Sequence, residues 1–145
     1  SKAHGLAALR LGFCVSNPEL SDYLNRVRQP FNANSLALDL GKVALSDQEH
    51  ISKSVKINSS GMERVKKAFA NFDYNFIESW GNFISFDAKQ DSDVAFQYFL
   101  EKGVILRSLK VYEMPHHLRV SIGTEEEMDF FLQVLEDYEK DLSKK

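Results

Sequence analysis

An apolar stripe between residues 51 and 69 constrains the fold of this chain more than any other feature of its sequence. Its members are separated by three, four or seven positions: Ile51, Val55, Met62, Val65 and Phe69. This spacing places side chains on one face of an α-helix and predicts a helix of about 25 residues. Asp47 is suited to cap the start of that helix. Gly61 interrupts the stripe at a cost of about 1 kcal/mol relative to alanine, which indicates a local bend.

The residues before the stripe predict one strand and two shorter helices. Apolar and other residues alternate over Leu9–Ser16, as in a half-buried strand, but the chain offers no obvious pairing partner for it. Asn17 and Pro18 are typical of a helix start, and Pro30 stops the helix that follows. After a polar connector, a second helix is expected to run through about Leu45.

From about residue 74 the pattern changes to short strands alternating with helices. Four segments are predicted to be strands: Tyr74–Glu78, Asn82–Phe86, Val104–Leu109 and Leu118–Ile122. A helix that begins at Ser92 or Asp93 is expected to end at Gly103, and Thr124 opens the last helix with a capping box. The predicted fold class is therefore α+β, with helices packed on one face of a small sheet.

Composition and charge limit the classes of partner. The chain has 145 residues, enough for one domain with a real core, and its net charge of −3 gives no reason to expect a nucleic-acid or membrane partner. No apolar run reaches the ~20 residues that span a bilayer. Cys14 has no second cysteine to pair with, so a cytoplasmic location is expected. His116 and His117 lack companion ligands, so no metal site is expected.

The N-terminal residues hold the sharpest chemical candidates. A lysine such as Lys2 can form a Schiff base with a carbonyl compound once it loses its proton. Ser1 could hold a phosphate through its hydroxyl, and Arg10 through a two-pronged guanidinium contact. Composition and spacing alone favour a plainer interpretation, in which Ser1 and Lys2 are a frayed terminus and Arg10 is a solvated strand residue.

Five segments of the chain together resemble the fold-type-I pyridoxal-phosphate aminotransferases. They are Ser1–Gly12, Asn25–Ala37, Gly81–Phe83, Gly103–Arg107 and Leu118–Thr124. They occur in the order found in that family, and the resemblance covers essentially the whole chain. Within the superfamily, the set is most similar to the histidinol-phosphate aminotransferases.

The resemblance implies a role for each candidate residue. Lys2 would bind pyridoxal phosphate through its amine and would move the proton between the substrate Cα and the cofactor. Ser1 and Arg10 would hold the cofactor phosphate. Arg107 and Arg119 would form the cationic end of the substrate pocket, which receives the substrate phosphate in this family. Taken alone, the residues around Arg107 favour a solvent-facing strand end, and Arg119 would face either solvent or a cleft.

The resemblance also divides the chain. Residues 1–46 would be a remnant of the cofactor-binding large domain with its connector, and residues 47–145 would be the C-terminal small domain, beginning with a long interdomain helix; the whole fold is α/β by family. In the family, the other cofactor-binding residues precede the lysine. The chain is therefore expected to be a C-terminal part that is inactive alone and binds pyridoxal phosphate weakly or not at all. Ser108 stands where the family frequently has proline, which leaves the geometry after Arg107 open.

The expected function of the parent protein is amino transfer between histidinol phosphate and a keto acid, in histidine biosynthesis. Its ligand would be a small phosphorylated amino alcohol or amino acid. Two alternatives remain: an aromatic aminotransferase or threonine-phosphate decarboxylase relative, and a non-catalytic module that binds anions or a partner. A homodimer, or self-association through residues 1–46, is expected because an unpaired apolar strand invites pairing with another chain.

Overall fold

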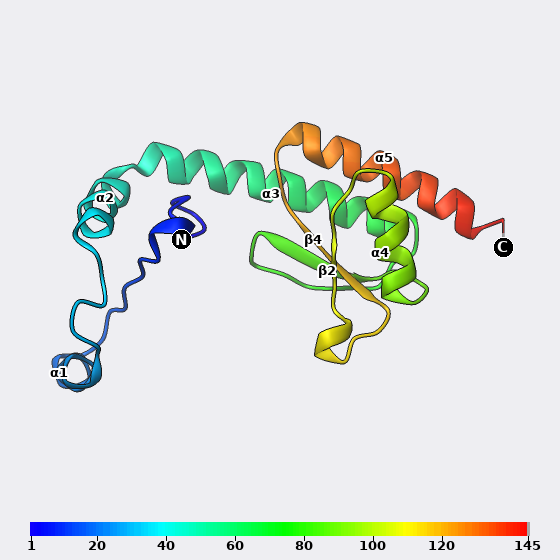
Figure 1. Ribbon diagram of the computed structural model, residues 1–145. Coiled ribbons are helices and arrows are strands. Elements are labelled where there is room, and N and C mark those ends of the chain that lie inside the picture. Colours follow the sequence, from blue (N-terminus) through cyan, green and yellow to red (C-terminus); the bar gives the residue numbers. More distant parts are fainter. Residues whose placement is uncertain (145) are drawn as a thin grey trace. The chain divides into compact units, whose positions relative to one another are not determined.

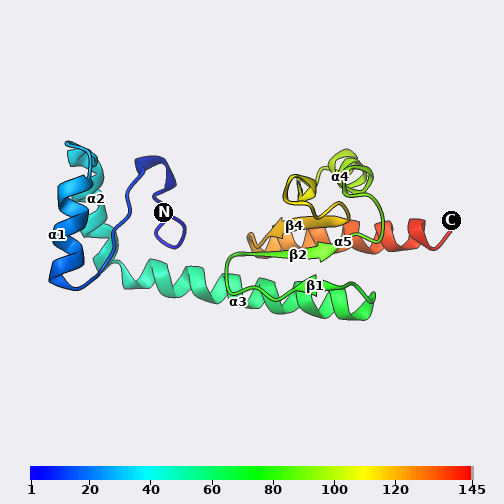
Figure 2. The same cartoon turned by 90° about the horizontal axis from the view of Figure 1, so that it is seen from below.

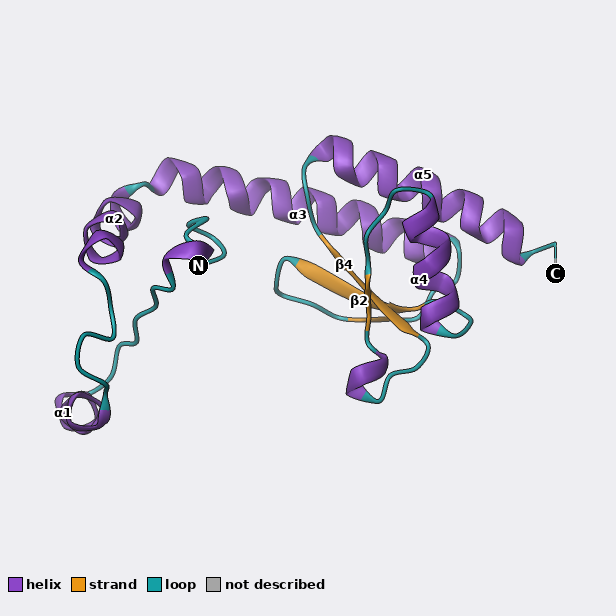
Figure 3. Ribbon diagram, viewed as in Figure 1, coloured by secondary structure: helices purple, strands orange, loops and turns teal. Residues whose placement is uncertain are grey.

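The computed structural model describes residues 1–144, which form two compact units, Ser1–Val55 and the residues from Lys56 onward. Figure 3 shows which segments of each unit are helical and which are strands. One helix, α3 (Gln48–Asn71), begins in the first unit and ends in the second. No helix among residues 1–144 combines the length and the apolar character needed to cross a membrane.

The first unit contains the two helices that the sequence predicts before α3, together with one short 3₁₀-helix. Its elements are η1 (Ala7–Leu9), α1 (Pro18–Val27) and α2 (Ser35–Ser46). An asparagine side chain caps the start of both α1 and α2. Asn17 accepts a hydrogen bond from the Leu20 amide at 2.8 Å, and Asn34 accepts one from the Ala37 amide at 2.7 Å. These bonds satisfy amides that have no partner inside the helix.

The strand expected over Leu9–Ser16 is wrong. Leu9 ends the 3₁₀-helix η1, Arg10 has a left-handed backbone with φ of 53°, and residues 11–17 are neither helix nor strand. The alternating pattern is present, but Phe13 and Val15 are exposed rather than packed on a core. A strand requires a hydrogen-bonded neighbour, and the described residues supply none to this segment.

The second unit is a four-stranded antiparallel sheet with the order β1-β2-β4-β3. Its strands are β1 (Phe76–Ile77), β2 (Phe83–Asp87), β3 (Arg107–Ser108) and β4 (His117–Ser121). The helices α4 (Ser92–Glu101) and α5 (Glu125–Leu142), with the part of α3 from Lys56 onward, cover one face of this sheet (Figures 1 and 2). The α+β class and the one-sided helix layer are therefore confirmed.

Two of the four strands are shorter than the sequence predicts, because helix ends use part of each segment. The Tyr74 amide donates to the Phe69 carbonyl at 2.8 Å, which continues the end of α3 rather than a strand. The Val104 amide likewise donates to the Phe99 carbonyl at 2.8 Å and closes α4, after Gly103 turns the chain with φ of 86°. These bonds leave only two residues of each segment in the sheet.

The core lies between the sheet and its helices. Ile84 and Phe86 of β2 and Leu118 and Val120 of β4 point toward the helices and are buried. They join a cluster that includes Val65, Phe69, Phe99, Phe131 and Leu135. The predicted caps at two helix starts are also confirmed: Asp47 accepts from the His50 amide at 3.0 Å, and Thr124 and Glu127 form both bonds of the capping box.

Gly61, which interrupts the apolar stripe in the sequence, has a packing role in the structure. It lies within the uninterrupted helix α3 and is buried. A Cβ at this position would stand 2.6 Å from Cγ2 of Ile122 and 3.5 Å from Cγ of Met128. Because the Ile122 methyl is attached directly to Cβ, it cannot swing away as the end of a long side chain would. The glycine therefore permits close approach of α3 and the segment after β4.

We expect Gly61→Ala to lower the free energy of unfolding by about 1–3 kcal/mol, the usual cost of overpacking a core. Helix propensity alone would give the opposite sign, a gain of about 1 kcal/mol. Urea denaturation followed by circular dichroism measures the difference. The matched control is Ser60→Ala at the neighbouring exposed position, which should be neutral or slightly stabilising. If Gly61→Ala behaves like this control, the close contact with Ile122 is not a constraint.

Candidate functional site

The N-terminal segment folds back on itself through two hydrogen bonds. The Ser1 hydroxyl donates to the Leu11 carbonyl at 3.2 Å, and the Gly5 amide donates to the Lys2 carbonyl at 3.0 Å. Gly5 has φ of 66°, a conformation that glycine adopts without steric cost. The first bond brings Ser1 next to Leu11, the residue that follows Arg10.

Lys2 and Arg10 are both exposed. One guanidinium nitrogen of Arg10 donates to the Ala7 carbonyl at 3.1 Å, which leaves its other N–H groups for an anion. A hydroxyl and a guanidinium can donate hydrogen bonds to a phosphate ester, and an amine can condense with an aldehyde. Ser1, Arg10 and Lys2 therefore fit the phosphate and the aldehyde of pyridoxal phosphate chemically.

A cavity of about 480 Å³ lies beside Ser1 in the first unit. Its walls include His4, Leu11, Gly12 and Gly41, whereas Lys2 and Arg10 are not among its lining residues. The volume falls in the range of small-molecule sites. The structure therefore brings Ser1 to a cavity but does not bring all three predicted cofactor residues to the same one.

The two predicted substrate arginines lie directly opposite each other on neighbouring strands. Arg107 of β3 pairs in register with Arg119 of β4, and Arg119 in turn pairs with Ser85 of β2. All three lie on the sheet face away from the helices, because their neighbours along the strands point into the core. Like charges that face each other across two strands destabilise the pairing. An anion between the arginines would remove that repulsion.

Aromatic side chains hold both guanidiniums in place. Arg119 lies over the ring of Phe83, 4.8 Å from its centroid, and its Nε is buried without a hydrogen-bond partner. Arg107 donates to the Tyr112 hydroxyl at 2.8 Å and lies 5.5 Å from the centre of that ring. Arg119 is thus half-buried rather than freely solvated, whereas Arg107 is exposed.

Within residues 1–144, neither Arg107 nor Arg119 forms an ion pair with a carboxylate. Among the described residues, arginine ion pairs join Arg26 with Asp22 and Arg64 with Asp129, and none includes Arg107 or Arg119. No group of three or more histidine, cysteine, aspartate or glutamate side chains within residues 1–144 could hold a metal ion. The outer face of the sheet therefore offers two unpaired cations to an anionic ligand.

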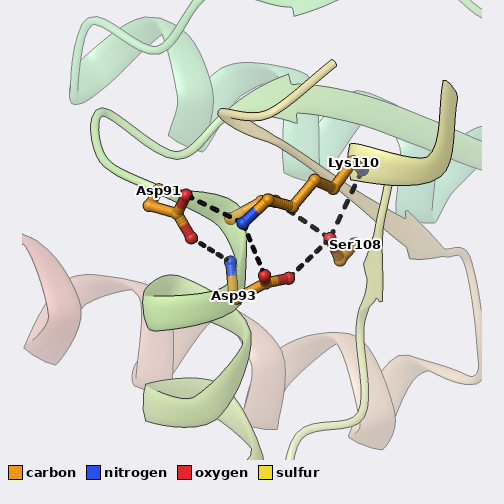
Figure 4. Close-up of polar contacts among 5 residues, drawn as sticks. Asp91, Asp93, Ser108 and Lys110 are labelled. Atoms are coloured by element: carbon orange, nitrogen blue, oxygen red, sulfur yellow. Dashed lines mark hydrogen bonds and ion pairs between the residues drawn. The ribbon is translucent and has the colours of Figure 1, made fainter. Parts of the chain in front are cut away.

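A polar network joins Ser108, the residue after Arg107, to Asp91, Asp93 and Lys110 (Figure 4). The Lys110 ammonium contacts Asp91 at 3.2 Å and Asp93 at 2.7 Å, and the Ser108 hydroxyl donates to Asp93 at 3.2 Å. The pKa of Asp91 is lowered mainly by two hydrogen bonds, of which the one from the Asp93 amide has the larger effect and the one from Lys110 the smaller. The two aspartates in turn raise the pKa of Lys110. Ser108 thus bonds to the helix α4 where a proline could not.

Sequence reasoning missed the residues that hold the arginines. Phe83 belongs to one of the five family-like segments, but no pattern links it to Arg119, 36 positions later. Tyr112 meets Arg107 only because the short 3₁₀-helix η2 (Lys110–Tyr112) turns the chain back after β3. Such a turn carries no hydrophobic periodicity, so periodicity gave no signal of this contact.

Comparison with known proteins identifies the family. Residues 1–135 match the family described as aminotransferase class I and II. The chain belongs to this family. It is 46% identical over 136 residues to histidinol-phosphate aminotransferase 1 of Nitrosococcus oceani, covering 94% of this chain and 37% of that protein. It is 48% identical over 135 residues to histidinol-phosphate aminotransferase 2 of Pseudomonas fluorescens, covering 93% and 36%. The chain thus spans little more than a third of the curated relatives it matches.

Solved structures of aminotransferases share the fold. A putative aminotransferase from Burkholderia pseudomallei superposes with a TM-score of 0.88 at 27% identity, covering 96% of this chain and 43% of that one. The histidinol-phosphate aminotransferase from Sinorhizobium meliloti, solved in complex with pyridoxal-5′-phosphate, has a TM-score of 0.81 at 23% identity, covering 98% and 40%. The fold predicted from the resemblance is therefore confirmed.

We expect Lys110→Met to raise the pKa of Asp91 only part of the way to its ordinary value, because the hydrogen bond from the Asp93 amide, the largest single cause of the lowered pKa, remains. The contribution of this carboxylate to stability is present above its unfolded-state pKa and is lost as the pH falls through its lower folded-state pKa. Carboxyl ¹³C NMR titration measures the shift. Lys144→Met, which removes the partner of Asp141 instead, should leave Asp91 unchanged.

Proposed function

We propose that this chain supplies the cofactor lysine and the substrate-phosphate site of a pyridoxal-phosphate-dependent aminotransferase that acts on histidinol phosphate. The observation that carries the proposal is the opposition of Arg107 and Arg119 on the free face of the sheet, without a carboxylate partner among the described residues. The curated relatives named histidinol-phosphate aminotransferases support it, at 46–48% identity. Residues 1–46 would belong to the cofactor domain and residues 47–145 to the small domain.

The two arginines suit a phosphate monoester better than a carboxylate. A phosphate monoester carries a charge of about −1.5 to −2 at pH 7 and three acceptor oxygens, so it can bind two guanidiniums at once. Phe83 and Tyr112 restrict the two side chains before the ligand arrives, which lowers the entropy lost on binding. Ser85, next to Arg119 in register, adds a hydroxyl donor on the same face.

The first unit would hold the cofactor through Ser1, Lys2 and Arg10. When bound, pyridoxal phosphate supplies an electron-withdrawing ring that makes the proton on the substrate Cα removable. Ser1 and Arg10 would fix the cofactor phosphate, and Lys2 would accept the Cα proton and return it. Because Lys2 is exposed in the 145-residue chain, this chain by itself would bind the cofactor weakly or not at all.

We also propose that the chain self-associates through residues 1–46. Large apolar side chains in this region are strongly exposed, with Phe13 at 76%, Val15 at 89%, Val27 at 79% and Phe31 at 99%. The buried positions of α2 are Ala37 and Gly41, which form no core of large side chains. Exposed apolar surface on this scale is typical of an interface, and a homodimer would cover it with a second copy.

For the aminotransferase that contains this chain, we expect Arg119→Ala to lower kcat/KM for histidinol phosphate about 10- to 100-fold, the effect of losing ~1.5–3 kcal/mol of charged hydrogen bonds. The value for histidinol, which has no phosphate, should barely change. Arg64→Ala is the matched control, because Arg64 is already paired with Asp129. Equal losses with both substrates would contradict a phosphate site at Arg119.

Analytical ultracentrifugation tests the self-association. We expect the 145-residue chain to sediment as a dimer or larger species, with a mass that rises with concentration. Replacing Val15 and Val27 by serine should shift it toward the monomer, because both side chains lose apolar surface. Val111→Ser, at a position that is 81% exposed in the second unit, is the control and should have no effect. A monomer at high concentration would refute the proposal.

A further inference from the structure

The strand that carries Arg107 is held by very few sheet bonds. β3 comprises only Arg107 and Ser108, and it lies at the edge of the sheet with β4 as its one neighbour. An edge strand of two residues has little intrinsic stability, because most of its backbone groups are unpaired. The position of Arg107 therefore depends on contacts outside the sheet.

Ser108 supplies such contacts on the opposite face. It pairs in register with Leu118, whose side chain is buried against the helices, so the Ser108 hydroxyl points away from Arg107 toward α4. There it lies 2.9 Å from the hydroxyl of Ser92, which is fully buried, and 3.2 Å from a carboxylate oxygen of Asp93. Two first-turn residues of α4 thus hold the strand.

The direction of these bonds follows from the acceptor at the end. Asp93 is ion-paired with Lys110, and a carboxylate can only accept a hydrogen bond, so Ser108 donates to it. Ser92 must then donate to Ser108, because the Ser108 proton is already used. Lys110 contacts the second carboxylate oxygen of Asp93 and so keeps its charge compensated. Each hydroxyl proton therefore has one defined acceptor, which favours a single arrangement of the chain at β3.

The same network sets the start of η2. Lys110 is the first residue of this 3₁₀-helix, and Tyr112, its last residue, accepts the hydrogen bond from Arg107. Ser108 and Lys110 therefore anchor the two segments that determine the position of the Arg107 side chain. These segments are β3, which contains Arg107, and η2, which contains its hydrogen-bond partner Tyr112.

We propose that Ser108 and Asp93 are positioning residues that hold Arg107 and Tyr112 in the geometry needed to bind an anion, an inference that rests on the proposed phosphate site. Neither residue would touch the ligand. Their effect is to restrict Arg107 before binding, so that less conformational entropy is lost when a phosphate binds. A purely structural network would instead affect the stability of the second unit and leave the order of the Arg107 side chain unchanged.

The test uses the 145-residue chain and inorganic phosphate as the probe. Arginine Nε–Hε NMR signals report both the phosphate Kd and the order of each guanidinium, and circular dichroism gives the Tm. We expect Ser108→Ala and Asp93→Asn to weaken phosphate binding about three- to tenfold and to make the Arg107 Nε–Hε group more mobile. Ser108→Thr keeps the hydroxyl and should retain both properties. Glu125→Gln, another exposed first-turn acid, is the control for charge at a helix start and should change neither.

Two further variants separate the inference from the proposed function. If Arg107→Ala and Arg119→Ala weaken phosphate binding but Ser108→Ala and Asp93→Asn do not, the phosphate site stands and the positioning role is wrong. If neither arginine variant changes the Kd, the phosphate site is wrong, and increased Arg107 mobility in Ser108→Ala would still support the positioning of its side chain. Unchanged mobility in both Ser108→Ala and Asp93→Asn overturns the positioning role in every case.

Discussion

The antiparallel pairing of β2 with β4 fixes both the core and the candidate binding face of the second unit. The register joins Phe83 to Ser121 at one end and Asp87 to His117 at the other. Because side chains alternate between faces, this single register sends Ile84 and Phe86 into the core and leaves Arg119 outside. A slip of one residue would bury the arginine and expose the core, so packing energy enforces the position of the charge.

The two units differ in how many of their apolar side chains they bury. The second unit has four buried phenylalanines from different elements, Phe69, Phe86, Phe99 and Phe131, in one continuous cluster. The first unit has well-capped helices but few buried side chains. Local capping and long-range packing are therefore separate in this chain: the former determines where each helix begins, whereas only the latter gives a unit a core of its own.

Local signals explain what the sequence predicts well. The helix starts at Asn17, Asp47 and Thr124 rest on hydrogen bonds between residues three positions apart, so the pattern contains the whole interaction. The strand over Leu9–Ser16 fails because its alternating pattern says nothing about a partner. The segment Val104–Leu109 is shortened because its first amide closes α4, a choice that depends on where Gly103 turns the chain.

The residues of the candidate site were predictable from the sequence, but their contacts were not. Family-like segments point to Arg107 and Arg119, but their opposition in register is a property of the sheet and not of either segment. The contact of Ser108 with Asp93 spans 15 positions. No periodicity in the sequence contains this contact, because it depends on how β3 lies against the start of a helix.

The opposed arginines have a thermodynamic consequence for the sheet that carries them. Their repulsion weakens the β3–β4 edge when no anion is present, and a bound dianion turns the same pair into an attraction. By linkage, two free energies are equal: the amount by which the paired edge favours binding of the anion, and the amount by which the bound anion favours the paired edge over its locally opened state. The affinity for an anion and the fraying of the two-residue strand β3 would thus be two readouts of one equilibrium, and salt, which screens the repulsion, would alter both.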